Sequence, residues 1–409
     1  MNRRLKLLLG IYLACMAVMH IFILFYFSDF TLKGYNDFAA TYTAGVILKT
    51  GRSTRLYDTN LQWNTQREFA KEVSIRKGPL PYLHPPFEAW LFFPLAHLKF
   101  ANAYIVWTMF KIGLLFLGIF LLIPSGPHRI FQALFIGILS LGLFPIAIDL
   151  LQGQDSMLLL FIFSLTFFLL RHKYDFWAGC ILALGLFKFH LVIPVALIFL
   201  FRQKLRFVVG FTAIAILLLL LSIKLIGWDQ VIYYPKYLWV LDHAHDIGVT
   251  TWENMPNFRG VLTSIFGGTK MVSAIPWIVF SSEALGVALT SWLWKKDEEI
   301  GSISFSAGFS LSILISMVTS YYIHSYELIF LLIPILCLGA PVFRNAEFEG
   351  WPRKIFIFGS ILLALSPVSW FLILRTRLFC WYGCAILMLF VISLGLMLRM
   401  ETPQECEVS

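Results

Sequence analysis

Asp37 is the first residue in the chain whose type and position could do chemistry. It belongs to a polar sequence that follows the apolar run 5–27. A carboxylate at the boundary between water and lipid can take a proton from a hydroxyl group. An aspartate with an ordinary pKa, near about 3.9, is ionised at neutral pH, as a base must be. The same position also suits an N-cap of a helix, which Asn36 or Asp37 could provide. Asp37 is therefore either a catalytic base or a helix cap.

Lys188 is an ionisable residue inside an apolar sequence, between Gly185-Leu186-Phe187 and Phe189, and His190 follows it. An ionised side chain within a membrane costs on the order of 2.5–3.5 kcal/mol, so its presence invites a functional explanation. The ammonium group either pairs with a lipid phosphate or extends toward the lipid headgroups. We expect Lys188, with His190 beside it, to be a phosphate ligand.

Three other polar breaks interrupt the apolar sequence. Gln154 lies in the polar run 152–155. This run either forms a glycine turn with a helix cap or provides a glutamine side chain that binds sugar hydroxyls. Arg259, which follows Asn257 in the second polar loop, is either a headgroup anchor or a clamp for phosphate. Tyr322 and His324 occupy the third break, where a single histidine is as readily structural as functional.

The composition identifies an integral membrane protein. Of the 409 residues, 59% are hydrophobic and 13% are charged, whereas a soluble protein is nearer half apolar and one-quarter charged. The many apolar runs exclude a transmembrane β-barrel. The net charge of +9 comes from short loops, which indicates membrane topology rather than nucleic-acid binding. None of the six cysteines lies in a long polar loop, and no acid-rich cluster demands a metal, so we expect neither a disulfide framework nor a metal site.

The elements that must position these residues are membrane helices. We expect about twelve crossings, with polar loops at 28–83 and 227–269 and a short tail at 399–409. The first loop should hold two helices that lie on the membrane, one over 37–49 and one from Asp58 to Glu72. The crossings are expected at 5–27, 101–123, 129–148, 157–170, 176–187, 191–201, 207–226, 271–294, 302–320, 328–343, 355–374 and 378–398.

The basic residues orient this topology. Those in 3–6, 171–173 and 202–206 should lie in the cytoplasm, which places the first polar loop outside and both termini inside. Between the first loop, outside, and residues 171–173, inside, the number of crossings must be odd, yet four apolar runs lie there. One of these runs should therefore not cross the membrane. The run 84–98 is the weakest, because it has about 15 residues against the ~20 needed and contains three prolines, so we expect it to be re-entrant. Residues 176–201 should form a tight hairpin with Lys188 at its apex.

Several short motifs follow one another in a fixed order. In that order they resemble the motifs of glycosyltransferase family 87, whose members belong to the GT-C superfamily, use polyprenyl-phosphate sugars and include bacterial lipid mannosyltransferases. The resemblance runs from about Leu5 to Pro334. Its motifs are Asp37-Phe38-x-x-x-Tyr42-x-Ala44, Leu48-x-x-Gly51, Leu56-Tyr57-Asp58 with Gln62, Tyr82-x-His84-Pro85-Pro86-Phe87 ahead of Phe93-Pro94-Leu95, Gly153-Gln154, Gly179 through Lys188 leading to Pro194, Asn257-x-x-Gly260, and Tyr326-Glu327-Leu328 ahead of Pro334.

The resemblance implies a single GT-C-like membrane domain over 1–409, all-α, with Asp37 as general base. In a single displacement, the base takes the proton of the attacking hydroxyl, and positive charge stabilises the departing phosphate. Two departures from the family pattern, Asp155-Ser156 and Asn257-Phe258-Arg259, leave the donor sugar in doubt. From the residues and the resemblance together, we expect the substrate-binding residues to be Lys188, His190, Gln154, Arg259, Asn257, Tyr322, His324 and His84.

The sequence therefore predicts an inverting hexosyltransferase of the bacterial inner membrane, most plausibly for mannose. The donor would be a polyprenyl-phosphate sugar and the acceptor a glycolipid or glycan on the outer face, without a cofactor, a metal or nucleic acid. Two alternatives stay open. One is a transporter or flippase of a lipid-linked glycan, and the other is a ligase or polymerase that uses lipid diphosphate donors.

Overall fold

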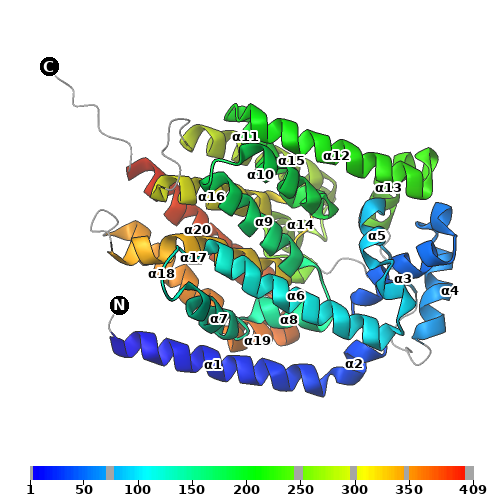
Figure 1. Cartoon of the computed structure of the whole chain (residues 1–409), viewed down its shortest axis with the longest axis horizontal. Coiled ribbons are helices and arrows are strands. Elements are labelled where there is room, and N and C mark those ends of the chain that lie inside the picture. Colours follow the sequence, from blue (N-terminus) through cyan, green and yellow to red (C-terminus); the bar gives the residue numbers. More distant parts are fainter. Residues whose placement is uncertain (1–2, 71–77, 244–251, 295–301, 345–349, 401–409) are drawn as a thin grey trace.

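The chain folds into packed helices that run mostly along one direction (Figure 1). The computed structural model describes residues 3–70, 78–243, 252–294, 302–344 and 350–400. Within these ranges every regular element is a helix and there is no strand. The predicted all-α class is therefore confirmed for the described residues. Most of the predicted tail, beyond Met400, lies outside them.

Six helical segments are long and apolar enough to cross a membrane. Two bent pairs could add one span each: α7 (Arg129–Ser140) with α8 (Phe144–Gln152), bent by 76°, and α18 (Trp351–Ala364) with the segment Ser366–Thr376, bent by 60°. The protein is thus a multi-pass integral membrane protein. The six segments lie in α1 (Arg3–Tyr26), α6 (Phe100–Leu122), Asp175–Phe201, α12 (Leu205–Ile226), Lys270–Leu293 with α15 (Ile275–Leu293), and α20 (Phe379–Met400).

The described residues thus contain six to eight candidate spans rather than about twelve. Three of the predicted crossings form shorter apolar helices, α9 (Ser156–Arg171), α16 (Ile303–Thr319) and α17 (Leu332–Arg344). Almost all of α16 is buried inside the protein. A helix surrounded by other helices is as apolar as a helix that faces lipid, so hydropathy alone overcounts spans.

The segment Asp175–Phe201 has the length of one span, but it folds back on itself. It consists of α10 (Asp175–Ala183), a 3-10 helix (Leu184–Lys188) and α11 (Phe189–Phe201). A straight helix of this length would separate its ends by about 39 Å, yet Asp175 and Arg202 line the same small cavity. The backbone of Lys188 leaves the helical conformation, with φ −111° and ψ 60°. These contacts confirm the predicted hairpin with Lys188 at its turn.

The first polar loop forms a compact group of short helices at one end of the molecule, at the right of Figure 1. The predicted helix after Asp37 is present as α3 (Phe38–Lys49), and Phe38 and Ile47 are fully buried. The second helix is α4 (Thr59–Phe69), whose N-cap Asp58 accepts a hydrogen bond from the Leu61 N–H, as predicted. The other described elements of this region are α2 (Ser28–Leu32) and the 3-10 turn Ser53–Arg55.

Residues 84–98, expected not to cross, contain only short helical pieces: a 3-10 turn (Pro86–Glu88), α5 (Ala89–Phe92) and a second turn (Leu95–His97). They pack against α3 so closely that a Cβ atom at Gly45 would lie 2.5 Å from the Phe92 carbonyl oxygen. Three prolines prevent a long helix here. No described helix in this stretch is long enough to span a membrane, as predicted.

The second polar loop forms α13 (Trp228–His243), the turn Trp252–Asn254 and α14 (Phe258–Phe266). Of the remaining described elements, Lys270–Ala274 precedes α15, Ser325–Leu331 precedes α17, and α19 (Ser366–Phe371) continues into the π-helix Leu372–Thr376.

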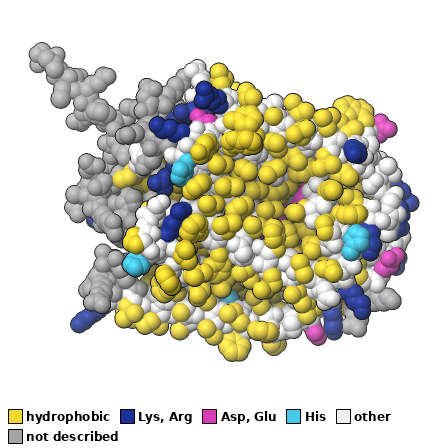
Figure 2. All heavy atoms as spheres, viewed as in Figure 1, with side chains coloured by type: hydrophobic (Ala, Val, Ile, Leu, Met, Phe, Trp, Pro, Cys, Tyr) yellow, Lys and Arg dark blue, Asp and Glu magenta, His cyan; other side chains and the backbone are white. Residues whose placement is uncertain are grey.

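Hydrophobic side chains cover the middle of the face in Figure 2, and charged side chains gather toward its two ends. This distribution is typical of a protein that spans a lipid bilayer.

Candidate functional site

Asp37 precedes α3, but its side chain does not cap the helix. Instead, the Gln154 Nε2 atom donates a hydrogen bond of 2.8 Å to the Asp37 Oδ2 atom. The Asp37 backbone N–H donates to Gln152 Oε1 at 3.3 Å. Gly153 makes this possible: it ends α8 in the left-handed conformation with φ 69°, and a Cβ atom there would lie 2.6 Å from the Phe38 Cβ atom. Two predicted site residues 117 positions apart are thus in contact.

A cavity of about 760 Å³ lies in front of this pair. Its polar lining residues include Asp37, Gln152, Gln154, Asn254 and His324, and its apolar lining includes residues of α1, α19 and the π-helix. His84 and Tyr326 also line it. Burial lowers the pKa of His324 to about 4, although Asp37 opposes this effect. His324 is therefore a neutral imidazole at pH 7, able both to donate and to accept a hydrogen bond.

Lys188 lies in a buried ionic cluster rather than extending to the headgroups. Its ammonium Nζ atom is 2.7 Å from Asp155 Oδ1 and 2.6 Å from Glu327 Oε1, and it donates to Ser156 Oγ at 3.1 Å. Lys188 is only 3% exposed. The ring of Tyr326 lies 5.1 Å from the ammonium. The cation is therefore held by two carboxylates from the α8–α9 turn and from the segment before α17.

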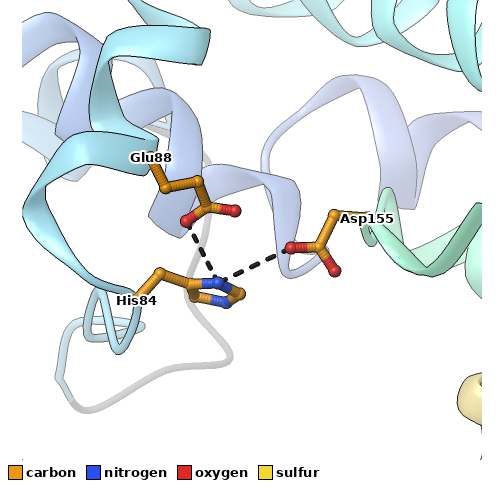
Figure 3. A group of neighbouring side chains, drawn as sticks. All are labelled: His84, Glu88 and Asp155. Atoms are coloured by element: carbon orange, nitrogen blue, oxygen red, sulfur yellow. Dashed lines mark ion pairs between the residues drawn. The ribbon is translucent and has the colours of Figure 1, made fainter. Parts of the chain in front are cut away.

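His84, Glu88 and Asp155 form a second part of this cluster (Figure 3). The His84 Nδ1 atom is 3.0 Å from Glu88 Oε2 and 3.5 Å from Asp155 Oδ2. The Tyr82 hydroxyl donates to Glu88 Oε2 at 3.0 Å. Burial raises the pKa of Glu88 to about 7, against the effect of His84. Burial also disfavours ionised Asp155, but Lys188 and His84 outweigh it and lower the pKa of Asp155 to about 2.

These three side chains offer one nitrogen and two oxygens within 4.8 Å of one another. Such donors suit a divalent cation such as Mn²⁺ or Zn²⁺. They equally suit a protonated imidazole between two carboxyl groups, and the two carboxylates raise the pKa of His84 despite its burial. His84, Glu88 and Asp155 thus form a buried group of titratable side chains beside the cavity of Asp37.

A further buried pair supports the turn that carries Gln154. The Lys111 ammonium is 2.7 Å from Asp149 Oδ1, and both side chains are fully buried. The Ser156 N–H donates to Asp149 Oδ2 at 3.1 Å. Lys111 therefore pairs inside the protein and does not extend to the membrane surface. Asp149 was missed, although a carboxylate inside the apolar run 144–151 was the signal that could have found it.

Arg259 pairs with Asp242, which the sequence did not indicate. Two hydrogen bonds of 2.6 and 2.8 Å join the Arg259 Nη2 atom to both oxygens of Asp242. The hydroxyls of Tyr321 and Tyr322 donate to the same carboxylate at 2.7 and 2.5 Å, and the guanidinium lies 3.8 Å from the centre of the Tyr321 ring. Burial disfavours the ionised form of Asp242, but Arg259 outweighs it and lowers the pKa of this carboxyl. The positive charge of Arg259 is thus already balanced by the carboxylate of Asp242.

Asn257 has a structural position at the start of α14. Its Oδ1 atom accepts a hydrogen bond from the Gly260 N–H at 3.0 Å, and its Nδ2 atom donates to the Ser320 carbonyl at 2.7 Å. Its side chain is fully buried. These contacts fix α14, and therefore Arg259, against the segment that carries Tyr321.

Two further cavities lie near the first one and are related to it through shared lining residues. A cavity of about 110 Å³ is lined by His84, Lys188, His190, Tyr322, His324 and Glu327. It shares His84 and His324 with the cavity of Asp37. It shares His190 and Tyr322 with a groove of about 570 Å³ between α11, α13 and α15. Seven of the nine predicted site residues therefore line these three cavities, whereas Asn257 and Arg259 do not.

Comparison with known proteins identifies the chain. The model of glycosyltransferase family 87 matches residues 82–319, more than half of the chain. No curated protein and no solved structure matches it. The matched range includes His84, Gln154, Lys188, His190, Asn257 and Arg259, whereas Asp37, Tyr322 and His324 lie outside it. The predicted family is confirmed: this chain belongs to glycosyltransferase family 87 and is a multi-pass membrane glycosyltransferase.

Proposed function

We propose that the enzyme moves a hexose, with mannose the first to test, from a polyprenyl phosphate to an acceptor hydroxyl, and that Asp37 is the general base. One observation carries this proposal. The carboxylate of Asp37 and an apolar groove suited to a polyprenyl chain line cavities that adjoin the same small cavity, which shares His84 and His324 with the first and His190 and Tyr322 with the second. A donor with a long apolar tail and a small polar head fits this order of surfaces.

The donor tail would lie in the groove between α11, α13 and α15. Ile193 and Leu197 of α11 and Phe280 of α15 line this groove and are also exposed at the protein surface, so a prenyl chain could enter from the lipid. The phosphate would then occupy the 110 Å³ cavity near Lys188 and His190. The sugar would extend past His84 and His324 toward Asp37.

The charge balance adds a condition to donor binding. Lys188 already faces the carboxylates of Asp155 and Glu327, so a phosphate would add negative charge to a cluster that is not positive. A proton on His84 or Glu88 would offset this charge. Because the pKa of Glu88 is about 7, the cluster can hold that proton near neutral pH.

The transfer itself would be a single displacement. The acceptor oxygen forms a bond to the anomeric carbon, while the bond between that carbon and the phosphate oxygen breaks and the phosphate leaves with the electron pair. The hydroxyl proton moves to Asp37, and the configuration at the anomeric carbon inverts. Gln154, which donates to Asp37 Oδ2, would hold the carboxylate in position. Phosphate is a good leaving group, so a second catalytic carboxylate is not needed.

The proposed orientation places Asp37 at the outer face of the membrane. α9 begins at the turn beside Asp37 and ends at Arg171, about 22 Å away along its axis. The basic residues Arg202 and Lys204 lie near that far end, around the cavity that also contains Leu170 and Asp175. Basic residues favour the cytoplasmic side, which supports an outer position for Asp37.

The test compares Asp37→Asn with Asp29→Asn in reconstituted membranes. Asp29 is a matched control, because it comes from the same loop and its side chain is 85% exposed. With a polyprenyl-phosphate-[¹⁴C]hexose donor, Asp37→Asn should lower transfer by at least 100-fold and leave donor binding within about threefold. Asp29→Asn should retain activity. Full turnover by folded Asp37→Asn would remove Asp37 from the mechanism, and turnover only with a lipid diphosphate donor would replace the proposed donor class.

A further inference from the structure

We propose that His84, Glu88 and Asp155 bind one divalent cation, Mn²⁺ or Zn²⁺, whose open side faces the phosphate of the donor. The binding site itself does not depend on the proposed function, whereas the contact with a donor phosphate rests on it. We expected no metal site from the sequence, in which Asp155 is far from His84 and Glu88. The fold brings the three side chains together.

The three donor atoms are spaced as ligands of one ion. The His84 Nδ1 atom is 3.0 Å from Glu88 Oε2 and 3.5 Å from Asp155 Oδ2. Atoms that bind a zinc ion at about 2.0–2.2 Å are about 2.8–3.6 Å from one another in octahedral or tetrahedral geometry. Both distances from His84 fall in this range. Figure 3 shows the two carboxylates on the side of the ring that carries Nδ1.

Polar atoms of these side chains lack the hydrogen bonds that burial requires. Within the described part of the chain, His84 Nδ1, Glu88 Oε1 and Asp155 Oδ2 make no hydrogen bond, although all three atoms are shielded from solvent. The approach of Nδ1 to Glu88 Oε2 is short enough for a hydrogen bond, so it fails by its direction. A protonated imidazole would need that hydrogen bond, whereas a cation in front of Nδ1 would supply the missing partner.

The charges around the site leave room for a divalent cation. The described side chains near Lys188 include three buried carboxylates, those of Glu88, Asp155 and Glu327. With His84 neutral, three negative charges then face the one positive charge of Lys188. A divalent cation balances the difference, whereas a single proton leaves one negative charge. Because an unbalanced buried charge is costly, this group of residues favours the divalent cation.

Neighbouring side chains hold two of the ligands in place. The Tyr82 hydroxyl donates to Glu88 Oε2 at 3.0 Å. The Lys188 ammonium is 2.7 Å from Asp155 Oδ1, while the other oxygen, Oδ2, lies toward His84. Tyr82 and Lys188 are themselves buried. Such outer contacts orient the ligands of a metal ion and are typical of built metal sites.

The open side of the site faces the cavities in which we placed the donor. His84 lines both the cavity of Asp37 and the 110 Å³ cavity that Lys188 also lines. Three protein ligands leave at least one coordination position free, as in catalytic metal sites. A phosphate oxygen of the donor could take this position. The phosphate charge would then lie between the cation and the Lys188 ammonium.

The first experiment measures binding of the metal alone. The full-length protein in lipid nanodiscs is stripped with EDTA and dialysed at pH 7 against MnCl₂ or ZnCl₂, and bound metal is counted by mass spectrometry. We expect one ion per protein and an affinity at least tenfold lower in His84→Gln. His97→Gln is the matched control, because His97 belongs to the same segment but is exposed, and it should bind as the wild type does. No binding by the wild type, or equal affinity of the wild type and His84→Gln, would overturn the site.

The second experiment uses a variant that removes a ligand without leaving a buried charge unpaired. Glu88→Gln lacks one carboxylate of the site, so in EDTA it should be at least as stable as the wild type. We expect MnCl₂ or ZnCl₂ at a hundredfold excess over its Kd to raise the melting temperature of the wild type by about 2 °C or more. The rise in Glu88→Gln should be less than half as large. An equal rise in both proteins would overturn the site.

Transfer of a ¹⁴C-labelled hexose from polyprenyl phosphate separates this site from the proposed function. The stripped wild type should bind the donor at least tenfold more weakly than the metal-loaded wild type, and added metal should not restore binding in His84→Gln. An ion that binds but leaves donor affinity unchanged would overturn the phosphate contact. No transfer by the metal-loaded wild type would instead refute the proposed function and leave the metal site standing.

Discussion

Replacing Lys188 with methionine would remove the one cation between the carboxylates of Asp155 and Glu327. The two contacts are 2.7 and 2.6 Å, and all three side chains are at most 4% exposed. Removing one partner from a buried ion pair costs about 3–5 kcal/mol, because it leaves a charge that water cannot solvate. Here two carboxylates lose the same partner, so we expect a loss at the upper end of that range.

The assay is the free energy of unfolding of the protein in lipid nanodiscs, measured for Lys188→Met, Glu327→Gln and the double variant. A loss of about 5 kcal/mol corresponds to roughly a five-thousandfold change in the unfolding equilibrium. The double variant should be more stable than Lys188→Met, because it has one buried charge fewer, and this non-additivity is the signature of direct pairing. If Lys188→Met left stability unchanged and weakened only donor binding, Lys188 would be a phosphate ligand without a structural role, and the reasoning would be wrong.

Three further predictions follow from other contacts. Gln154→Ala should lower turnover by about 10-fold or more while donor affinity stays nearly constant, because Gln154 holds the Asp37 carboxylate; steady-state kinetics would check this, and an unchanged turnover would contradict it. The pKa of Glu88 rises from 4.5 to about 7 in the folded protein, so the folded state binds its proton more tightly and stability should fall as pH rises between these values; thermal unfolding as a function of pH should show this fall in the wild type and less of it in Glu88→Gln. Asp242→Asn would leave Arg259 without its anionic partner, so we expect tighter binding of anionic donor analogues but lower stability, whereas weaker anion binding would show that Asp242 itself contributes to the site.

Much of the architecture was predictable because it depends on local sequence. The hairpin around Lys188, the helix that follows Asp37, the Asp58 cap and the absence of a crossing at 84–98 were all expected from apolar run lengths, prolines and capping residues. The number of spans was not predicted correctly. The helix α16, for example, is apolar because other helices bury it. Hydropathy measures the polarity of the surroundings and does not distinguish lipid from protein.

The candidate site was predictable in its members but not in their partners. Gln154, His324 and Lys188 were singled out because polar residues are costly in an apolar chain, whereas Asp37 was singled out by its place after the first apolar run and His84 by a family motif. Their arrangement around cavities with shared lining residues, and the pairing of Lys188 with Asp155 and Glu327, were not predictable. Glu88 and Asp242 received no role at all, although each is central to a cluster.

The sequence alone therefore determined that this chain is a membrane protein, where its helices break, and that it resembles glycosyltransferase family 87. These properties follow from composition and short motifs, which act within a few residues. The tertiary structure decided which charges neutralise one another and which surfaces face the Asp37 carboxylate. The Arg259–Asp242 and Lys188–Glu327 pairs join residues 17 and 139 positions apart, because a buried charge in a low-dielectric interior must find its partner wherever the packing of helices brings one.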